Sequence, residues 1–423
     1  MAVPASMLDD INGKYYQVKT GEDTSDILWG ESGDLKFFQL SMSDFDDSRW
    51  EKLLNQLTLD ESIVLAAYGG PKLPGASSIG LVERASAENT GNGIQTYVPQ
   101  TSLDQDAPWY IGEDDNNGKM SLKVFGSAPL VASSFNHDVM YETGVYIGTE
   151  ALFVGVPILW GPGANTHRHA YNGRNGEYYS EDPVLTGVCT MEFAIGALEK
   201  GLIVATKHFA FNDQDTNRQG IAPFMTEQRA REVELRAFQI AIEANKYDRL
   251  YGENVGMLGM MTSFSKIGAV ECTCSRGLLN GIAVGEWGFH GYTVTDGVDD
   301  TDLFSAIVIG GCTGYDKRGT NDMKLETINK DFSDCGNQIT AERYAGDATF
   351  QKALKASNKR LLFALCHSNL MNAYNATTHT ESCLTWWRVA YVAAIVVAAI
   401  GSVGSIALYV VSVVKNKKDG DIV

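Results

Sequence analysis

The sequence predicts an α/β fold, a TIM-like (β/α)8 barrel that is either complete or incomplete, followed by one C-terminal transmembrane helix. Three observations support this prediction. Apolar strand-like runs alternate four times with helix-like segments in the middle of the chain. Clusters of Arg, Lys, His, Asp or Glu follow these runs, as happens where the parallel strands of a barrel carry polar groups to one rim. Val389–Val414 contains no charged residue.

Length and composition are typical of one large globular domain with attachments. The chain has 423 residues, is 44% hydrophobic and carries a formal net charge of −18. This charge argues against nucleic acid as a partner, because phosphate binding needs clustered Lys and Arg. The cysteines are scattered, and Cys272-Thr-Cys274 has the spacing of neither a zinc knuckle nor a redox pair, so we expect free thiols. No metal or other cofactor is predicted.

The N-terminal part precedes the predicted barrel. Residues 1–45 are polar and rich in turn formers, so we expect a linker or arm there, with an edge strand as the alternative. The barrel domain is predicted over residues 46–370. Its first helix has leucines at helical spacing after Trp50, and Thr58 followed by Glu61 is a capping-box pattern that predicts the start of a second helix.

The barrel domain itself is predicted from alternating patterns of hydrophobicity. The expected strands are Val154–Trp160, Leu202–Thr206, Met257–Thr262 and Tyr292–Thr295. The expected helices are Asp138–Leu152, Pro183–Lys200, Glu227–Ala244 and Ser275–Glu286, with a closing helix over residues 340–370. Right-handed crossovers between parallel strands bring all strand carboxyl ends to one face. The polar clusters that follow these strands are therefore expected to meet there.

The C-terminus predicts a membrane anchor. A polar stalk is expected over residues 371–385, a transmembrane helix over 386–414 and a basic tail over 415–423. The uncharged run would form a helix of about 39 Å, which is long enough to cross a hydrocarbon core of about 30 Å. Trp386 and Trp387 stand at one end, where aromatic side chains favour the membrane interface. The lipid bilayer is therefore an expected partner.

The flanking charges predict an orientation for this single-pass anchor. Three lysines follow the helix and one arginine precedes it, which favours a cytoplasmic tail and an extracytoplasmic barrel. The N-terminus has neither a basic start nor an apolar core, so it does not read as a signal peptide. Either the domain stays inside on a tail anchor, or Met1 is not the natural start. The second interpretation is preferred.

Polar residues at the strand ends suggest glycoside hydrolysis. A retaining mechanism needs two carboxylates about 5 Å apart, one as nucleophile and one as acid/base. Asp296 is the first charged residue after Tyr292–Thr295 and suits the nucleophile, although it could instead cap a helix. Lys207 and His208 follow another strand. They can donate hydrogen bonds to sugar hydroxyls and help keep a carboxylate ionised, or they can form a structural ion pair.

A Gly/Asn-rich loop after the first predicted strand adds further charged residues. Arg168 is expected to contact the substrate. Arg174 and Glu181 are expected to stabilise the loop, because opposite charges close in sequence tend to pair. The two histidines beside Arg168 have no carboxylate at metal-ligand spacing, so they do not predict a metal site.

Four blocks of sequence resemble glycoside hydrolase family 3, the family of β-glucosidases and β-xylosidases. The blocks are NTHRHAYNGRNGEYYSEDP, KHFAFNDQDTNR, MMTSFSK and GEWGFHGYTVTDG. They occur in the family's order, and the resemblance covers residues 50 to 312. It implies a barrel domain, a retaining mechanism and a β-linked oligosaccharide or glycoside as substrate, cleaved in an exo manner.

The resemblance also implies roles for individual residues. Asp296 matches the family's nucleophile. Met261 would form a wall of the sugar pocket. The residues that would grip the terminal sugar are Asn89, Arg168, Lys207, His208 and Arg218.

Several departures from the family pattern bear on catalysis. Asn89 stands where the family often has Asp, Phe264 where it has Tyr, and Gly297 where it has Trp. The family's acid/base is commonly a Glu on a separate α/β sandwich domain, so we expect it to come from a domain absent from this chain. A non-catalytic, membrane-anchored carbohydrate-binding pseudo-enzyme is the alternative. A β-N-acetylhexosaminidase is disfavoured, since KHFAFNDQD contains no second His.

Overall fold

The computed structural model divides the chain into two units. Residues 1–378 form the first unit and residues 379–423 the second. The residues that the structure describes are 21, 23–67, 72–85, 87–89, 94–95, 125–212, 214–218, 221–244, 257–297, 303–315, 341–373 and 386–419.

A six-stranded sheet forms the centre of the first unit, with strand order β10-β7-β6-β5-β3-β4. Strands β3, β5, β6, β7 and β10 run parallel, and β4 pairs with β3 in the antiparallel direction. The bounds are β3 Ala87–Asn89, β4 Ile94–Gln95, β5 Ile158–Trp160, β6 Ile203–Phe209, β7 Gly259–Thr262 and β10 Tyr292–Val294. The predicted parallel α/β fold is confirmed. Within the described residues the sheet is open and corresponds to the incomplete form of the barrel.

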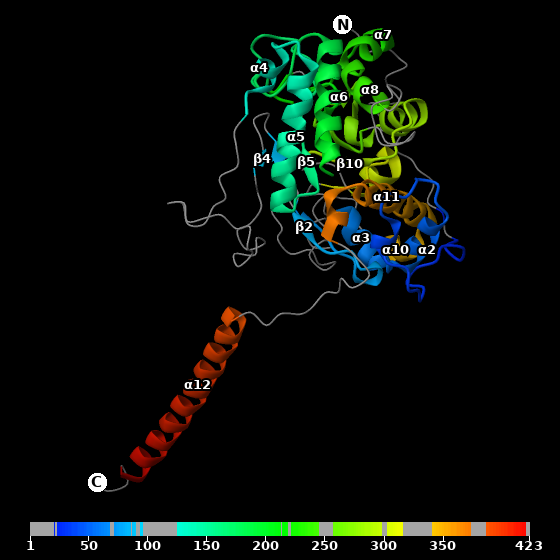
Figure 1. Ribbon diagram of the computed structural model, residues 1–423. Helices are drawn as coiled ribbons and strands as arrows, with labels where there is room; N and C mark the ends of the chain where they lie inside the picture. Colours follow the sequence, from blue (N-terminus) through cyan, green and yellow to red (C-terminus); the bar gives the residue numbers. More distant parts are fainter. Residues whose placement is uncertain are drawn as a thin grey trace. The chain divides into compact units, whose positions relative to one another are not determined.

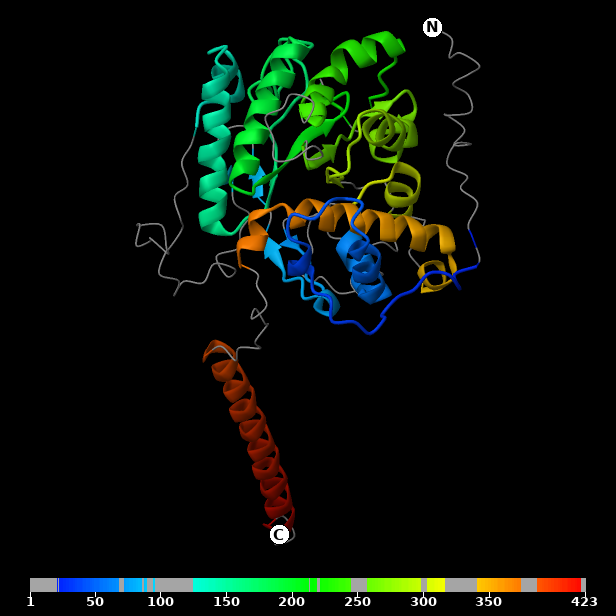
Figure 2. The same cartoon turned by 45° about the vertical axis from the view of Figure 1, so that its right-hand side comes forward.

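Helices α5, α6 and α8 lie side by side in the same unit (Figures 1 and 2). Helix α11 crosses beneath the sheet, close to α2 and α3, as Figure 2 shows. The helix bounds are η3 Phe37–Leu40, α2 Arg49–Gln56, α3 Leu59–Ala67, η4 Ser77–Ile79, α4 Ala128–Ala132, α5 His137–Val154, α6 Pro183–Glu199, α7 Glu227–Arg229, η5 Ala230–Glu234, α8 Arg236–Ile242, η7 Cys272–Cys274, η8 Gly277–Glu286, η9 Ser305–Gly310, α10 Ala341–Gly346, α11 Ala348–Cys366 and η11 Asn369–Ala373. Two small antiparallel pairs join Lys72–Leu73 (β1) to Arg84–Ala85 (β2) and Lys266–Ile267 (β8) to Val270–Glu271 (β9).

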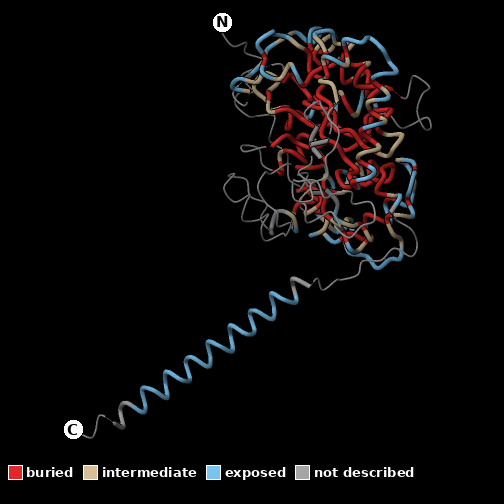
Figure 3. The backbone as a smooth tube through the Cα atoms, turned by 60° about the vertical axis from the view of Figure 1, so that its left-hand side comes forward, coloured by how far each residue is buried: buried red, intermediate tan, exposed pale blue. Residues whose placement is uncertain are grey.

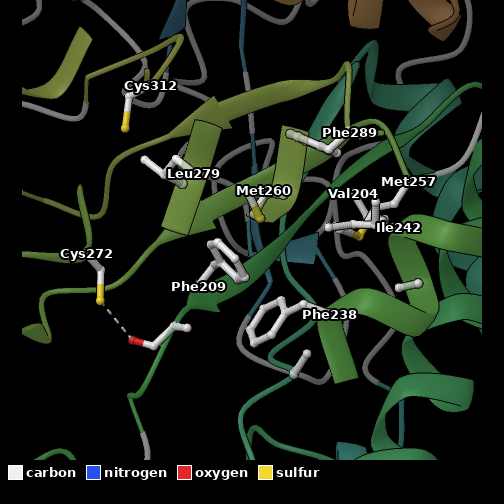
Figure 4. Packing of buried hydrophobic residues seen from close by; sticks show 14 of the residues in the cluster. Val204, Phe209, Phe238, Ile242, Met257, Met260, Cys272, Leu279, Phe289 and Cys312 are labelled. Carbon is white, nitrogen blue, oxygen red and sulfur yellow. Dashed lines mark hydrogen bonds between the residues drawn. The ribbon is translucent and has the colours of Figure 1, made fainter. Parts of the chain in front are cut away.

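The alternation of side chains along the strands separates two hydrophobic clusters. In Figure 4, Val204 lies beside Ile242 of α8, and Met260 points toward Phe209, whose ring packs on Phe238 of α8. The strand neighbours of Val204 and Met260 point to the other face, where they pack with α2 and the second half of α11. Figure 3 shows buried residues concentrated along the sheet and the helices that cover it. Strands β5, β6, β7 and β10 are buried on both faces, as is usual for parallel sheets.

The sequence predicted the first strand four residues too early. Val154 is the last residue of α5, and the strand begins at Ile158. Gly155 ends the helix in the left-handed conformation, with φ +69°, and its N–H bonds back to the last turn. The apolar run from Val154 therefore divides between two elements, and hydrophobicity alone cannot locate the break.

The helix predicted over Glu227–Ala244 is interrupted. A five-residue π-helix, η5, separates α7 from α8, and the N–H of Leu235 donates to the carbonyl of Ala230 at 2.8 Å. The helix predicted to begin at Ser275 is a π-helix from Gly277. A π-helical turn contains one extra residue. This hardly changes the spacing of apolar residues, so the sequence pattern does not reveal it.

The predicted start of α3 is confirmed, whereas the predicted closing helix differs from the structure. The Thr58–Glu61 capping box is confirmed, because each residue's backbone N–H is bonded by the other's side chain, at 3.0 and 3.1 Å. The single closing helix is instead two. Asp347 caps a new helix by accepting from the N–H groups of Thr349 and Phe350.

The second unit contains one long helix, α12, over Trp386–Asp419. Val389–Lys415 is long and apolar enough to cross a membrane, with a mean hydropathy of 2.3. Every side chain described in this stretch is exposed. Within the second unit, no described residue covers the apolar surface of this helix.

Candidate active site

Asp296 lies two residues beyond the end of β10 and is buried, with 5% of its surface exposed. Its Oδ1 accepts a hydrogen bond from the backbone N–H of Gly297 at 2.8 Å. Its Oδ2 lies 3.6 Å from Nε2 of His208, which comes from β6. The structure therefore brings together two of the predicted site residues from separate strands.

Lys207 and His208 lie inside β6, whereas the sequence placed them after the strand. The ladder between β6 and β7 shifts register between Thr206 and Phe209, and the Lys207–His208 peptide bond is cis. In a regular strand, consecutive side chains face opposite sides. Here both side chains reach buried carboxylates: Lys207 pairs with Glu177, and His208 lies beside Asp296.

The backbone of His208 is held by Asn165, in the loop after β5. The His208 N–H donates to Asn165 Oδ1 at 2.8 Å, and Asn165 Nδ2 donates to the His208 carbonyl at 3.0 Å. Both residues are buried. These two hydrogen bonds satisfy the N–H and the carbonyl of His208, at the point where the β6–β7 ladder shifts register.

The ring of His208 is oriented by Tyr178. The Tyr178 hydroxyl accepts from Asn212 Nδ2 at 3.0 Å and lies 3.2 Å from His208 Nδ1. Because the hydroxyl oxygen already accepts from Asn212, its own proton can be donated to Nδ1. In the neutral tautomer that accepts this proton at Nδ1, the ring proton is on Nε2, the nitrogen that faces Asp296.

Glu177 joins two cations in the same region. Its Oε1 lies 3.1 Å from Lys207 Nζ, and its Oε2 lies 2.6 Å from Arg174 Nη2. The Lys207 side chain is 1% exposed. Arg174 stabilises its loop as predicted, by pairing with its i,i+3 neighbour Glu177, whereas Glu181 is exposed.

Burial raises the pKa of Asp296 above its ordinary value of 3.8. The Gly297 N–H and the positive charges of Arg218, Lys207 and Arg174 act in the opposite direction and lower it. Removal from water disfavours the charged form, while nearby cations and donors favour it. Three cations are therefore arranged around a carboxylate that would otherwise resist ionisation.

Arg218 and Arg168 lie at the edge of this cluster. Arg218 forms an ion pair with Asp215 at 3.1 Å, and its guanidinium carbon lies 4.5 Å from the ring centroid of Phe264. Arg168 is exposed and donates to Gln214 Oε1 at 3.3 Å. The contact of Arg168 with substrate stays a prediction.

Met261 and Asn89 were also predicted to line the sugar pocket. Met261 is buried in β7 and pairs in register with Val294, two residues before Asp296. The backbone of Asn89 ends β3 and pairs with Ile94, whereas its side chain lies outside the described structure. Both residues thus belong to the central sheet, and their roles stay predictions.

Sequence reasoning assigned no site role to several residues that organise this region. Asn165, Tyr178 and Asn212 stand inside the polar blocks that follow the strands, so a signal was present. Glu234 had none, because it sits within a helical pattern. It lies in the π-helix η5, is buried, and accepts from the Thr166 hydroxyl at 3.2 Å, next to Asn165.

Most of the first unit resembles known proteins in sequence. Residues 36–309 match the glycosyl hydrolase family 3 N terminal domain. A β-glucosidase of Ruminococcus albus is 37% identical over 167 residues, which cover 40% of this chain and 17% of that protein. A β-glucosidase of Bacteroides ovatus is 28% identical over 264 residues, which cover 62% of this chain and 32% of that protein.

Solved structures show the same fold. β-Glucosidase 3B from Thermotoga neapolitana in complex with glucose aligns with a TM-score of 0.61 and 23% identity, over 77% of this chain and 43% of that one. A β-glucosidase from Paenibacillus barengoltzii aligns with a TM-score of 0.65 and 20% identity, over 88% of this chain and 38% of that one. The chain thus spans less than half the length of these relatives.

Proposed function

We propose that this chain, which belongs to glycosyl hydrolase family 3, carries the sugar pocket and the nucleophile of a retaining, exo-acting hydrolase of the β-glucosidase type. The observation that carries the proposal is the buried Asp296 at the end of β10, beside His208 and in the field of three cations. A carboxylate in this position has little packing value, because burial opposes its charge. The free-energy cost of burying this carboxylate is explained if its ionised form is the reacting nucleophile.

In the proposed reaction, Asp296 attacks the anomeric carbon of a β-linked glucoside and forms a covalent glycosyl-enzyme. The aglycone oxygen leaves with a proton from the acid/base, and water then releases the sugar with retention. Lys207, Arg174 and Arg218 help to keep Asp296 ionised by their charge. The N–H on Nε2 of His208 can hydrogen-bond either Asp296 or a sugar hydroxyl.

The acid/base is proposed to come from a separate α/β sandwich domain. Glu177 is the buried carboxylate nearest in the network, but it is bonded to both Lys207 and Arg174. A general acid must reach the leaving oxygen, and both carboxylate oxygens of Glu177 are already paired with cations. Glu177 therefore suits the positioning of Lys207 better than proton transfer.

Trapping of the glycosyl-enzyme tests the proposal. We expect the full chain to react with an activated aryl 2-deoxy-2-fluoro-β-glucoside, whose good leaving group needs little acid assistance. Mass spectrometry should then find the added sugar on the peptide that contains Asp296. Asp296→Ala should form no adduct, while the control variant Asp138→Ala, at an exposed aspartate of α5, should still form one. Absence of any adduct on the wild-type chain would refute the enzymatic proposal. An adduct formed only with the N-acetylglucosaminide analogue would favour a β-N-acetylhexosaminidase.

A carbohydrate-binding pseudo-enzyme is the second candidate. It is favoured by Phe264, whose ring carries no hydroxyl and is covered by the Arg218 guanidinium. Glucose binding that is detected by calorimetry and lost in Lys207→Met, together with no trapping of Asp296, would support this candidate instead.

We further propose that α12 anchors the protein in a membrane, with the barrel on the extracytoplasmic side and the lysine-bearing end in the cytoplasm. The support is the apolar stretch Val389–Lys415 and the charge difference between its two flanks. Protease added to intact cells should degrade the barrel unit. A barrel that is protected until the membrane is permeabilised would indicate the opposite orientation.

A further inference from the structure

A hollow of about 220 Å³ lies among the helices, and it shares no lining residue with the Asp296 cluster. It lies below the 300–1,000 Å³ typical of pockets for drug-sized ligands and far above the roughly 30 Å³ that one water occupies. A small, hydrated or partly hydrated ligand would therefore fit. The lining residues come from η8, the end of η9 and α11: Arg276, Asn280, Ile307, Val308, Gly311, Cys312, Ala353, Ala356, Ser357 and Arg360.

The hollow exists because α11 presents small side chains to it. Ala353, Ala356, Ser357 and Arg360 are spaced by three, four and seven residues from the first, so they share one face of the helix. The three small residues leave space beside the helix, and the long side chain of Arg360 borders it. A larger residue at position 356, which is exposed, would fill the hollow without removing any charge.

Two arginines line this space without a partner of opposite charge. Within the described residues, neither Arg276 nor Arg360 makes an ion pair or a hydrogen bond. The chain has an excess of acidic residues, with 52 Asp and Glu against 34 Lys and Arg. Five other described arginines pair with carboxylates, namely Arg49, Arg174, Arg218, Arg229 and Arg231.

The other polar groups of the hollow do not supply the missing negative charge. Asn280 Nδ2 donates to the Gly310 carbonyl at 3.0 Å, and the Ser357 hydroxyl donates to the Thr313 carbonyl at 3.2 Å. Burial raises the pKa of the Cys312 thiol, so it stays neutral. Burial also lowers the pKa of Arg360, which reflects the cost of a partly desolvated guanidinium. An anion in the hollow would offset this cost.

We infer that the hollow between η8, η9 and α11 binds a tetrahedral oxyanion, either free phosphate or the phosphate group of a small organic ester, through Arg276 and Arg360. A guanidinium offers paired N–H donors that match two oxygens of such an anion, and two guanidinium groups neutralise its double charge. The small side chains of α11 leave space for the anion next to Arg360, and Arg276 is an exposed lining residue. This site is independent of the proposed hydrolytic function.

Thermal unfolding of the full chain in detergent tests the inference. Inorganic phosphate, added at constant ionic strength set by potassium chloride, should raise Tm in a saturable manner, because a ligand that binds only the folded state stabilises it. Arg276→Gln and Arg360→Gln should each weaken phosphate binding at least tenfold. Ala356→Leu should do the same by filling the hollow while both arginines stay. Lys352→Gln, an exposed change of equal charge on α11, should leave the response unchanged.

The same assay distinguishes an organic phosphate ester from free phosphate, and it can also refute the inference. Tighter binding of glycerol 3-phosphate than of phosphate would identify an organic ester, and equal or weaker binding would identify the free ion. A Tm response of equal size in wild type, Arg276→Gln and Ala356→Leu would overturn the inference, as would no response to either compound. If Arg360→Gln does not fold, Arg276→Gln and Ala356→Leu decide the matter.

Discussion

Asn165 forms hydrogen bonds with both the N–H and the carbonyl of His208, at 2.8 and 3.0 Å. A side-chain amide is suited to this, since it offers one acceptor and one donor in a plane, as a neighbouring β-strand would. These two hydrogen bonds, the Asn165 clamp, lie where β6 leaves its regular ladder with β7. The loop after β5 thus completes the strand that carries Lys207 and His208 to Asp296.

Asn165→Asp should weaken both folding and activity. The carboxylate can still accept from the His208 N–H, but it cannot donate to the carbonyl, and it adds a buried charge. We expect a loss of about 2–4 kcal/mol in the free energy of unfolding, from one lost hydrogen bond and an uncompensated buried group. Urea denaturation measures this loss, and kcat/KM on an aryl glucoside should fall at least tenfold. The control is Asn175→Asp. Asn175 lies later in the same loop and donates to the carbonyls of His169 and Ala170, so this change should leave kcat/KM within a factor of three. Equal effects of both variants would argue against the clamp.

Asp296 should make the protein less stable as pH rises. Burial raises the pKa of this carboxyl, so between 3.8 and its folded-state pKa the folded chain holds more protons than the unfolded chain. Stability therefore falls with rising pH across that window and stays lower above it.

Asp296→Asn removes this titration. Its Tm should match or exceed that of the wild type at neutral pH, and the difference between the two proteins should shrink toward pH 4. Calorimetry across this pH range measures both curves. A variant that is markedly less stable than wild type at neutral pH would show that the cations, rather than burial, dominate.

Glu177 should be essential for holding Lys207 in place. Glu177→Gln leaves a 1% exposed ammonium group without its carboxylate, which we expect to cost about 3–5 kcal/mol of unfolding free energy. Adding Lys207→Met should recover part of this loss, because the second change removes the buried charge.

A double-mutant cycle by denaturant unfolding measures this coupling. The control is the half-exposed pair Lys266–Glu271, at 3.5 Å, where Glu271→Gln should cost less than about 1 kcal/mol. Strictly additive losses at Glu177 and Lys207 would mean that the two side chains do not stabilise each other.

Helix α12 should decide how the protein partitions. A chain that ends at Thr378 keeps the whole first unit, so it should fold and stay in the aqueous phase after detergent phase separation. The full chain should enter the detergent phase and resist extraction with alkaline carbonate. Val403→Asp, at the middle of the apolar stretch, adds about 2.5–3.5 kcal/mol to the cost of insertion and should reduce the membrane fraction. Carbonate-soluble full-length protein would refute the anchor.

Much of the fold could be predicted from the sequence, because strands and helix starts leave patterns within short segments of the chain. Apolar strands followed by polar clusters predicted a parallel α/β fold, and Thr58 with Glu61 predicted the start of α3. Strand β3 was missed, since Ala87–Asn89 contains two polar residues and gives no apolar run. The π-helix η5 was missed because one extra residue in a turn hardly alters the spacing of apolar residues.

The candidate site was predictable only as a set of residue types. The polar blocks contained Asp296, Lys207 and His208, but the partner of Lys207 lies 30 positions away in sequence. Glu177, which also pairs with Arg174, was one of several acidic residues in its loop and was not singled out. Contacts of this kind depend on how two loops approach one another. No periodicity or spacing within a single segment records that approach.

The sequence by itself determined which residues reach the strand ends and which helix is apolar throughout, because alternation and hydrophobicity act along the chain. Only the tertiary structure decided that Asn165 clamps His208, that Glu177 joins Lys207 to Arg174, and that Asp296 is buried. These features arise when segments distant in sequence exclude water between them. The resulting low polarity raises the pKa of Asp296 and strengthens its interaction with the surrounding cations.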